Sequence, residues 1–197
     1  MGDLLPYTDK LEDALVYAAQ LHRDQTRKGT SVPYVTHLLA VAAIVGENGG
    51  TEDEVIAALL HDAPEDAGGE ARLSEIRDRY GDPVADIVAG CTDTYEDPKP
   101  PWRARKEAYL DHLAGAPKPV RLVSSADKLH NARSVLADYR AVGEGLWARF
   151  NGGREGTLWY YRAVADALRR AGDGPLVDEL DRVVAELERL AGGHRVS

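Results

Sequence analysis

The segment Val55–Leu60, with the sequence VIAALL, carries an apolar side chain at every position. Successive residues of an α-helix are separated by about 100°, so such a run has no polar face and needs cover on all sides. The preceding residues favour a helix start, because Thr51 can cap it and Glu54 stands three residues later, as in a capping box. The sequence therefore predicts a central, buried helix.

Helical periodicity extends over most of the remaining chain. No segment shows the alternation typical of a strand, and DTYEDPKPPW at 93–102 reads as a proline-rich loop. We expect further helices at about 9–24, 36–47, 73–80, 83–92, 103–113, 119–139, 154–171 and 175–190. The length of 197 residues fits one domain. We therefore predict a single all-α domain over 1–197, with its core at about 9–171 and a C-terminal amphipathic helix at about 175–191.

Charge and composition exclude several classes of function. The formal net charge of −9 argues against a protein that coats a nucleic acid polymer, although a local basic pocket could still hold a small anion. Cys91 is the one cysteine, so neither an intrachain disulfide nor a cysteine-based zinc cluster can form. The first residues do not resemble a targeting signal, and no apolar stretch has the length of a membrane span. We expect a cytoplasmic protein without a membrane partner; the oligomeric state is not indicated.

A polar cluster, HDAPED at 61–66, follows the buried run directly. Pro64 lacks an N–H and disfavours helical geometry at Ala63, so the regular helix is expected to end or kink near Asp62. Imidazole and carboxylate groups together suit a divalent cation such as Mn²⁺, Fe²⁺ or Zn²⁺, but His61 and Asp62 do not complete a site. A solvated helix end would look similar. The residues alone leave the further ligands open among His22, His37, His112, His130, His194 and the segment around Asp127.

Three segments, PYVTHLLAVAAIV, AALLHDAPEDAG and SSADKLHNARSV, resemble in this order the motifs of the HD-domain phosphohydrolases. With HRDQTRKGTSVPY ahead of them, the chain from about Leu11 to Leu168 is most similar to the hydrolase domain of the Rel/Spo alarmone family and to the small alarmone hydrolases. The resemblance implies an HD-domain helical bundle. It also implies one divalent ion, usually Mn²⁺, with Fe²⁺, Co²⁺ or Zn²⁺ as alternatives, held by His37, His61, Asp62 and Asp127.

The same resemblance assigns roles to other residues. Glu65 and Asp66 correspond to the acidic pair that works on the attacking water, where a carboxylate is needed to orient it and take its proton. Arg27 and Lys28 correspond to phosphate contacts, for which both side chains are suited. Asn131 is a candidate contact for a ribose hydroxyl or a phosphate, and Tyr160 for the nucleoside. His22 is expected to support the site rather than bind the ion.

The function implied is Mn²⁺-dependent hydrolysis of the 3′-diphosphate of ppGpp or pppGpp, the alarmones of the stringent response, to pyrophosphate and GDP or GTP. No alarmone synthesis is expected, because 197 residues leave no room for a synthetase domain. One alternative keeps the ion and changes the nucleotide to ppApp, to the 2′-phosphate of NADPH or to a nucleoside monophosphate. Another is a binding protein that sequesters a nucleotide or a toxic synthetase without catalysis. The presence of Glu65 and Asp66 argues against the binding protein, because binding alone does not need a pair that activates water.

Overall fold

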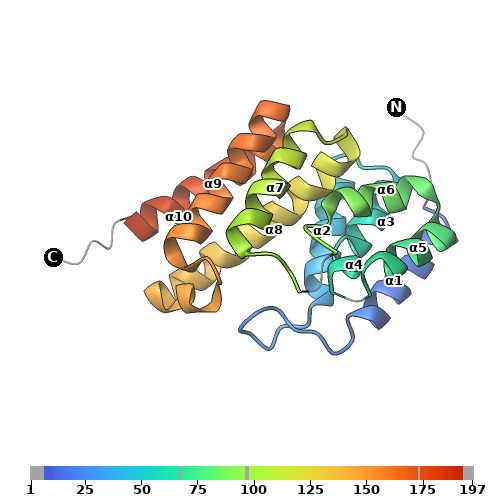
Figure 1. The fold of residues 1–197 in the computed structure, drawn as a ribbon, viewed down its shortest axis with the longest axis horizontal. Helices are drawn as coiled ribbons and strands as arrows, with labels where there is room; N and C mark the ends of the chain where they lie inside the picture. Colours follow the sequence, from blue (N-terminus) through green and yellow to red (C-terminus); the bar gives the residue numbers. More distant parts are fainter. Residues whose placement is uncertain (1–6, 67, 96–97, 173, 193–197) are drawn as a thin grey trace. The chain divides into compact units, whose positions relative to one another are not determined.

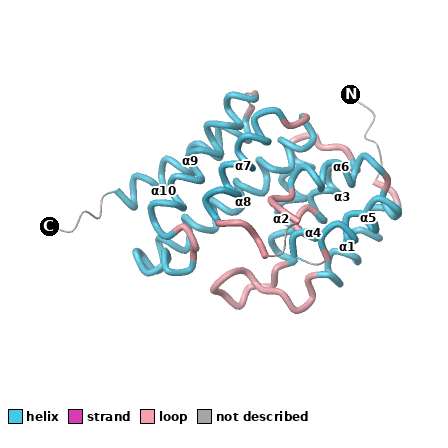
Figure 2. The backbone as a smooth tube through the Cα atoms, viewed as in Figure 1, coloured by secondary structure: helices cyan, strands magenta, loops and turns pink. Residues whose placement is uncertain are grey.

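The computed structural model describes residues 7–66, 68–95, 98–172 and 174–192. In these ranges the chain forms helices and connecting loops (Figure 2). The only extended pairing in them is an isolated bridge between Thr26 and Pro33. The predicted all-α class is confirmed. The chain divides into two compact units, Met1–Tyr95 and Glu96–Ser197, which are described separately. The single domain expected from the sequence stays a prediction.

The first unit is built around a central helix. Its helices are α1 (Asp9–Leu21), α2 (Val35–Glu47), α3 (Glu52–Leu60), α4 (Ala63–Asp66), α5 (Gly69–Tyr80) and α6 (Asp82–Cys91) (Figure 1). Helix α3 packs against α1, α2 and α6, and its residues from Glu54 to Leu60 are all buried. Thr51 and Glu54 form both hydrogen bonds of a capping box. The predicted buried helix and its cap are therefore confirmed.

The helix break expected at Pro64 is present. Helix α3 ends at Leu60, His61 is its C-cap, and α4 begins two residues later. Pro64 lies in the first turn of α4, where the missing N–H costs no helical hydrogen bond. The N–H of Asp66 donates to the carbonyl oxygen of Asp62 at 3.0 Å. The break thus ends the regular helix at His61 and places Ala63–Asp66 in a short turn of their own.

The second unit is organised around a long helix. It comprises α7 (Trp102–Gly115), α8 (Lys118–Val142), the 3₁₀ helix η1 (Gly143–Arg149), α9 (Gly153–Ala171) and α10 (Pro175–Gly192). Helix α8 packs against α9, α10 and η1, while α7 packs against α9. The apolar stripe of α10 is buried at Leu176, Leu180, Val183 and Leu187, so this amphipathic helix completes the core of the unit.

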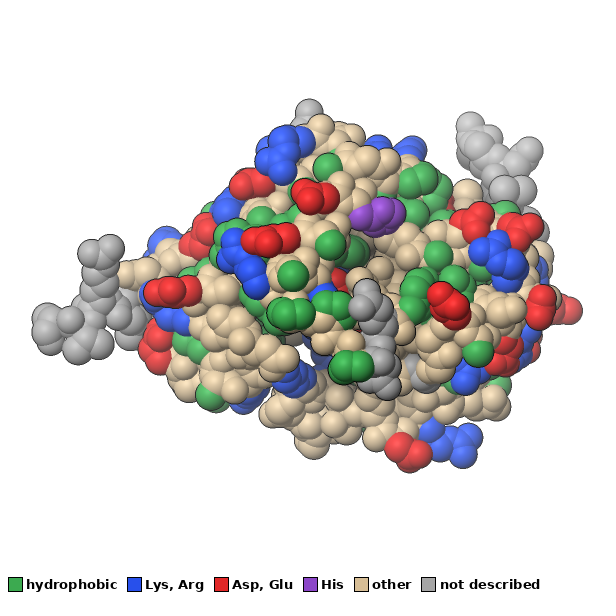
Figure 3. All heavy atoms as spheres, in the orientation of Figure 1, with side chains coloured by type: hydrophobic (Ala, Val, Ile, Leu, Met, Phe, Trp, Pro, Cys, Tyr) green, Lys and Arg blue, Asp and Glu red, His purple; other side chains and the backbone are tan. Residues whose placement is uncertain are grey.

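Charged side chains of both signs are interspersed over the face drawn in Figure 3, rather than separated into one basic and one acidic area. Several form pairs within a unit, such as Arg189 with Glu186 on α10 and Arg79 with Asp13 between α5 and α1. None of the helices in the described ranges is long and apolar enough to cross a membrane.

Candidate metal centre and the residues around it

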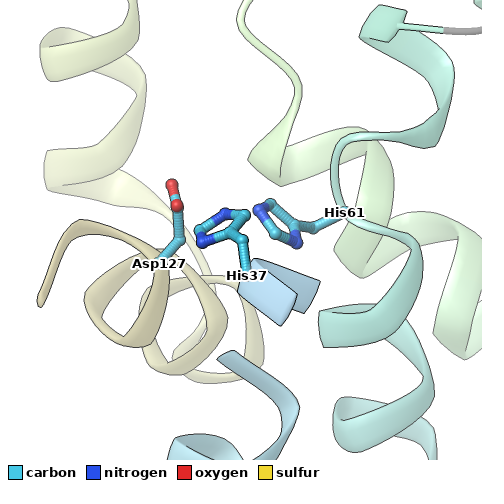
Figure 4. A group of neighbouring side chains, drawn as sticks. All are labelled: His37, His61 and Asp127. Atoms are coloured by element: carbon cyan, nitrogen blue, oxygen red, sulfur yellow. The ribbon is translucent and has the colours of Figure 1, made fainter. Parts of the chain in front are cut away.

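Two histidines and an aspartate converge in the first unit. His37 lies in the first turn of α2 and is fully buried, and His61 at the end of α3 is 2% exposed. Their rings lie edge to face with centroids 5.3 Å apart (Figure 4). Oδ2 of Asp62 lies 3.0 Å from Nε2 of His61 and 3.6 Å from Nε2 of His37. Oδ2 of Asp62 therefore faces the Nε2 atoms of both histidines.

The hydrogen bonding of His61 shows which of its nitrogens could bind a cation. Its Nδ1 lies 2.7 Å from the carbonyl oxygen of Ala58, which can only accept, so Nδ1 carries a proton. In the uncharged ring Nε2 then holds a lone pair, and that lone pair faces Oδ2 of Asp62. Two acceptors at such a distance repel each other unless a proton or a cation lies between them. An imidazole anchored on a carbonyl in this way is the usual arrangement of a metal-ligating histidine, so the donor set fits a divalent ion.

Tyr34, which precedes α2, connects these groups. Its hydroxyl donates to Oδ2 of Asp62 at 2.5 Å. Its ring stacks on the ring of His22 with centroids 5.2 Å apart, and contacts the edge of His37 at 5.5 Å. The guanidinium carbon of Arg27 lies 5.8 Å from the centroid of the same ring. Tyr34 therefore orients the candidate ligand Asp62 and contacts a candidate phosphate-binding residue.

Asp127, the remaining predicted ligand, lies on α8 in the second unit and is 5% exposed (Figure 4). Nζ of Lys128 donates to its Oδ2 at 2.5 Å, and the amide of Asn131 donates to its Oδ1. Burial opposes the charge of Lys128, but its interactions with Asp127, Tyr160 and Tyr109 together outweigh burial and hold the pKa of Lys128 well above its ordinary value. The carboxylate of Asp127 is thus held by a cation one residue on and by an amide one helical turn on.

The predicted acidic pair lies in α4. Glu65 is half-buried, and Asp66 accepts a hydrogen bond on Oδ2 from Nε2 of Gln25 at 2.7 Å. Loss of water around its carboxylate raises the pKa of Asp66 above the ordinary value, and the negative charges of Asp62 and Glu65 act in the same direction. The hydrogen bond from Gln25 opposes this shift. An aspartate with a raised pKa holds a proton more readily than one at the ordinary value, as a general base requires.

The remaining predicted contacts lie in different surroundings. Lys28 is exposed on the loop that joins α1 to α2. Tyr160 is 8% exposed and packs on the rings of Trp102, Trp159 and Tyr161 in the second unit. Nζ of Lys106 lies 5.1 Å from the centroid of the Tyr160 ring. Tyr160 is thus part of an aromatic core with a cation at its face.

The structure locates most of the other histidines that the sequence offered as alternative metal ligands. His22 is the C-cap of α1 and is 2% exposed, which suits a supporting residue. His112 is exposed on α7, His130 is half-buried on α8, and His194 lies outside the described residues. Sequence reasoning missed Tyr34 and Gln25. The sequence offers for Gln25 only its place three residues after His22, and the path of the loop that brings it to Asp66 is seen only in the structure.

An all-α fold in which His37, His61 and Asp62 converge beside a helix break is typical of a class of metal-binding helical proteins. Comparison with known proteins identifies the family. The family profile described as HD domain matches residues 14–158, and the chain belongs to this family. It is similar to the guanosine-3′,5′-bis(diphosphate) 3′-pyrophosphohydrolase MESH1 of Xenopus tropicalis, with 36% identity over 126 residues, 62% of this chain and 68% of that protein. The MESH1 protein of Danio rerio is 37% identical over 131 residues, 65% of this chain and 70% of the relative.

A solved structure supports the same assignment. It is described as a metazoan ortholog of SpoT that hydrolyses ppGpp and plays a role in starvation responses, and it matches with a TM-score of 0.76 and 27% identity. The match covers 91% of this chain and 96% of that one. The resemblance to HD-domain alarmone hydrolases that the motifs indicated is confirmed. HD-domain proteins of this kind are metal-dependent, which agrees with the donor set at His37 and His61.

Proposed function

We propose that this protein is a metal-dependent phosphohydrolase that removes the 3′-diphosphate of ppGpp and pppGpp, giving pyrophosphate and GDP or GTP. The observation that carries the proposal is the carboxylate of Asp62 facing Nε2 of both His37 and His61, with Glu65 and Asp66 following in the next turn. Its support from relatives is the shared activity in the names of the MESH1 proteins and the SpoT ortholog.

The ion is proposed to be Mn²⁺, with Asp127 as a further ligand beside His37, His61 and Asp62. Each of these histidines and Asp127 offers one ligand atom from a buried side chain. Imidazole and carboxylate donors suit Mn²⁺, and they also suit Fe²⁺, Co²⁺ and Zn²⁺. A bound divalent ion lowers the pKa of water and neutralises charge on a phosphoryl oxygen. His61 is held for this task by Ala58, and Asp62 by Tyr34.

The acidic pair is proposed to manage the attacking water. Asp66 has a raised pKa and a defined neighbour in Gln25, so it is the better placed to accept a proton. Glu65, from the same turn, is proposed to orient the water. Attack on the phosphorus bonded to the 3′ oxygen breaks the bond between them, and the 3′ oxygen leaves with a proton to form the ribose hydroxyl. Substitution of Glu65 or Asp66 is expected to lower turnover more than metal binding.

Four side chains are proposed to hold the nucleotide. Arg27 and Lys28 would bind phosphate oxygens, with Arg27 presented across the ring of Tyr34. Tyr160 would contact the nucleoside. Asn131 would bind a ribose hydroxyl or a phosphate while its amide also holds Asp127. No nucleic acid polymer and no membrane is expected as a partner, and a cytoplasmic location stays a prediction.

A substrate panel tests the proposal. Purified protein with Mn²⁺ is assayed against ppGpp, ppApp, NADPH and deoxynucleoside monophosphates, beside a Glu65→Gln, Asp66→Asn double variant. Release of pyrophosphate from ppGpp, lost in the double variant, is the expected result. Release of phosphate from NADPH alone would assign a different nucleotide to the same centre. Affinity for ppGpp without turnover would instead indicate a binding protein and contradict the proposed hydrolysis.

A further inference from the structure

A chain of hydrogen bonds in the first unit leads from His22 to Asp66 through Gln25, a residue to which the motifs assign no role. Nδ1 of His22 lies 2.6 Å from Oε1 of Gln25, and Nε2 of Gln25 donates to Oδ2 of Asp66 at 2.7 Å. The three residues come from the end of α1, the following loop and α4, and Gln25 and Asp66 are 41 positions apart in sequence. The contact therefore depends on the fold.

The direction of this chain follows from the chemistry of its end. The carboxylate of Asp66 can only accept when ionised, so the amide nitrogen of Gln25 faces it and the amide oxygen faces His22. An oxygen facing His22 requires a proton on Nδ1 of that ring. If the amide were reversed, its oxygen would meet the carboxylate of Asp66 and repel it. The Nδ1–H of His22 thus holds the amide of Gln25 in the one orientation that can donate to Asp66.

His22 and Gln25 are themselves held in place by main-chain hydrogen bonds and by packing. The N–H of Gln25 donates to the carbonyl oxygen of His22 at 3.1 Å, and the carbonyl oxygen of Gln25 accepts from the N–H of Tyr34 at 2.9 Å. The ring of His22 is 2% exposed and is stacked on Tyr34. A glutamine side chain loses about 1.5–2 kcal/mol of rotamer entropy when it is ordered, and here that cost is met on folding rather than during turnover.

The carboxylates around Asp66 explain why its hydrogen-bond donor is the neutral amide of Gln25. Asp66 follows Asp62 and Glu65 within one turn, and three carboxylates so close repel each other. A lysine or arginine would hold Asp66 but would also stabilise its charge strongly and weaken it as a base. The amide of Gln25 fixes Oδ2, and hence the plane of the carboxylate and the direction of Oδ1, without adding a charge.

We propose that Gln25 is a positioning residue, which with His22 behind it holds the carboxylate of Asp66 in the orientation needed to take a proton from the attacking water. The proposal rests on the proposed hydrolysis, because it assigns Asp66 as the base. Gln25 and His22 touch neither the nucleotide nor the ion in this account. Their effect is therefore expected in turnover and not in binding.

Kinetics of Gln25→Met test this role, because methionine has a similar length and cannot donate. Loss of a residue that orients a catalytic group typically costs about 10–100-fold in activity. We expect kcat to fall by about this factor, while KM for ppGpp and the Kd for Mn²⁺ stay within about threefold. Gln25→Glu, which places a carboxylate against Asp66, should be at least as slow. Gln20→Met, on the exposed side of α1, is the matched control and should keep the kcat of the unmodified protein.

A double-variant cycle separates positioning from general damage to the fold. If Gln25 acts through Asp66, adding Gln25→Met to Asp66→Asn should lower kcat no further. A similar fold loss in the Asp66→Asn background, or a loss confined to KM, would overturn the proposal. His22→Phe keeps a ring against Tyr34 but removes the donor, and should lower kcat; His22→Asn, whose amide can replace the Nδ1–H, should recover part of it. Equal kcat for these two variants would remove His22 from the proposal.

A spectroscopic readout keeps this inference separate from the proposed function. In metal-free protein, ¹⁵N NMR should show His22 with a proton on Nδ1 that exchanges slowly with solvent, and Gln25→Met should abolish that protection. The side-chain amide resonances of Gln25 should shift in Asp66→Asn. Absence of these signals would overturn the hydrogen-bond chain even if ppGpp is hydrolysed. Their presence in a protein that does not hydrolyse ppGpp would refute the proposed function while leaving the chain in place.

Discussion

Gly152 at the N-terminus of α9 offers the sharpest test of the packing around Tyr160. Its φ of −78° lies in the right-handed region, so alanine would meet no backbone strain. A Cβ atom there would lie 2.7, 3.0 and 3.1 Å from three carbons of the Trp102 ring. That ring already contacts Trp159 and Tyr160 with centroids 6.2 Å away, so it cannot turn aside without displacing them. Gly152→Ala is therefore expected to overpack this aromatic cluster.

Extra volume forced into a packed contact typically costs about 1–3 kcal/mol, and because Gly152 and Trp102 are half-buried the lower end of this range is expected. For a chain of this size, each kcal/mol lowers Tm by about 2–4 °C, so the variant should melt about 2–12 °C below the unmodified protein. Urea denaturation followed by circular dichroism gives the free energy of unfolding directly. Since the displaced rings include Tyr160, KM for ppGpp should rise as well.

Gly145 in η1 provides the matched control for this prediction. Among the described residues nothing lies within 4 Å of a Cβ built there, and its φ is not positive. Gly145→Ala should change the free energy of unfolding by less than about 0.5 kcal/mol. Combining Gly152→Ala with Trp102→Leu should destabilise less than the sum of the single variants, because the smaller side chain relieves the contact. Unchanged stability of Gly152→Ala, or strict additivity in the pair, would refute the reasoning.

Three further outcomes are expected. Leu60 is fully buried at the end of α3, so Leu60→Ala should lower the free energy of unfolding measured in urea by about 2–5 kcal/mol. A loss well below this range would contradict the central position of Leu60. Mn²⁺ at about 100 times its Kd should raise the free energy of unfolding by about 2.7 kcal/mol; a thermal shift retained in His61→Ala would argue against the proposed ligand. Hydrogen bonds from Arg189 and Arg140 lower the pKa of Glu186 from 4.5 to about 2. The contribution of Glu186 to the stability of the fold is therefore present above pH 4.5 and is lost as the pH falls through 2. Melting curves should therefore show a smaller loss of Tm over this window for Glu186→Gln than for the unmodified protein, and equal losses would contradict the shift.

The elements that sequence predicted well are those with a clear apolar pattern. Helix α3 could be placed because six consecutive apolar residues leave no polar face, and its capping box was readable from Thr51 and Glu54. Helix α5 begins at Gly69 rather than near 73, because Gly69–Arg72 carry little apolar signal. The 3₁₀ helix η1 was not predicted, since its sequence GEGLWAR contains two glycines and is too short for a period.

The residues of the candidate site likewise fall into two groups, those marked by a local sequence pattern and those that only the fold brings to the site. His61, Asp62, Glu65 and Asp66 stand out because polar residues follow a buried run without a spacer. His37 and Asp127 needed a family resemblance, because only the fold determines which distant side chains share an ion. The bonds of Gln25 and Tyr34 depend on the path of the loop at 22–34, which is set by main-chain contacts rather than by a periodic pattern.

The central claim is that water attacks the phosphorus bonded to the 3′ oxygen of ppGpp. Hydrolysis in ¹⁸O-labelled water with Mn²⁺, followed by mass spectrometry of both products, tests it most directly. Pyrophosphate is expected to carry one ¹⁸O atom and GDP none. Label in GDP, release of orthophosphate in place of pyrophosphate, or no cleavage of ppGpp would contradict it.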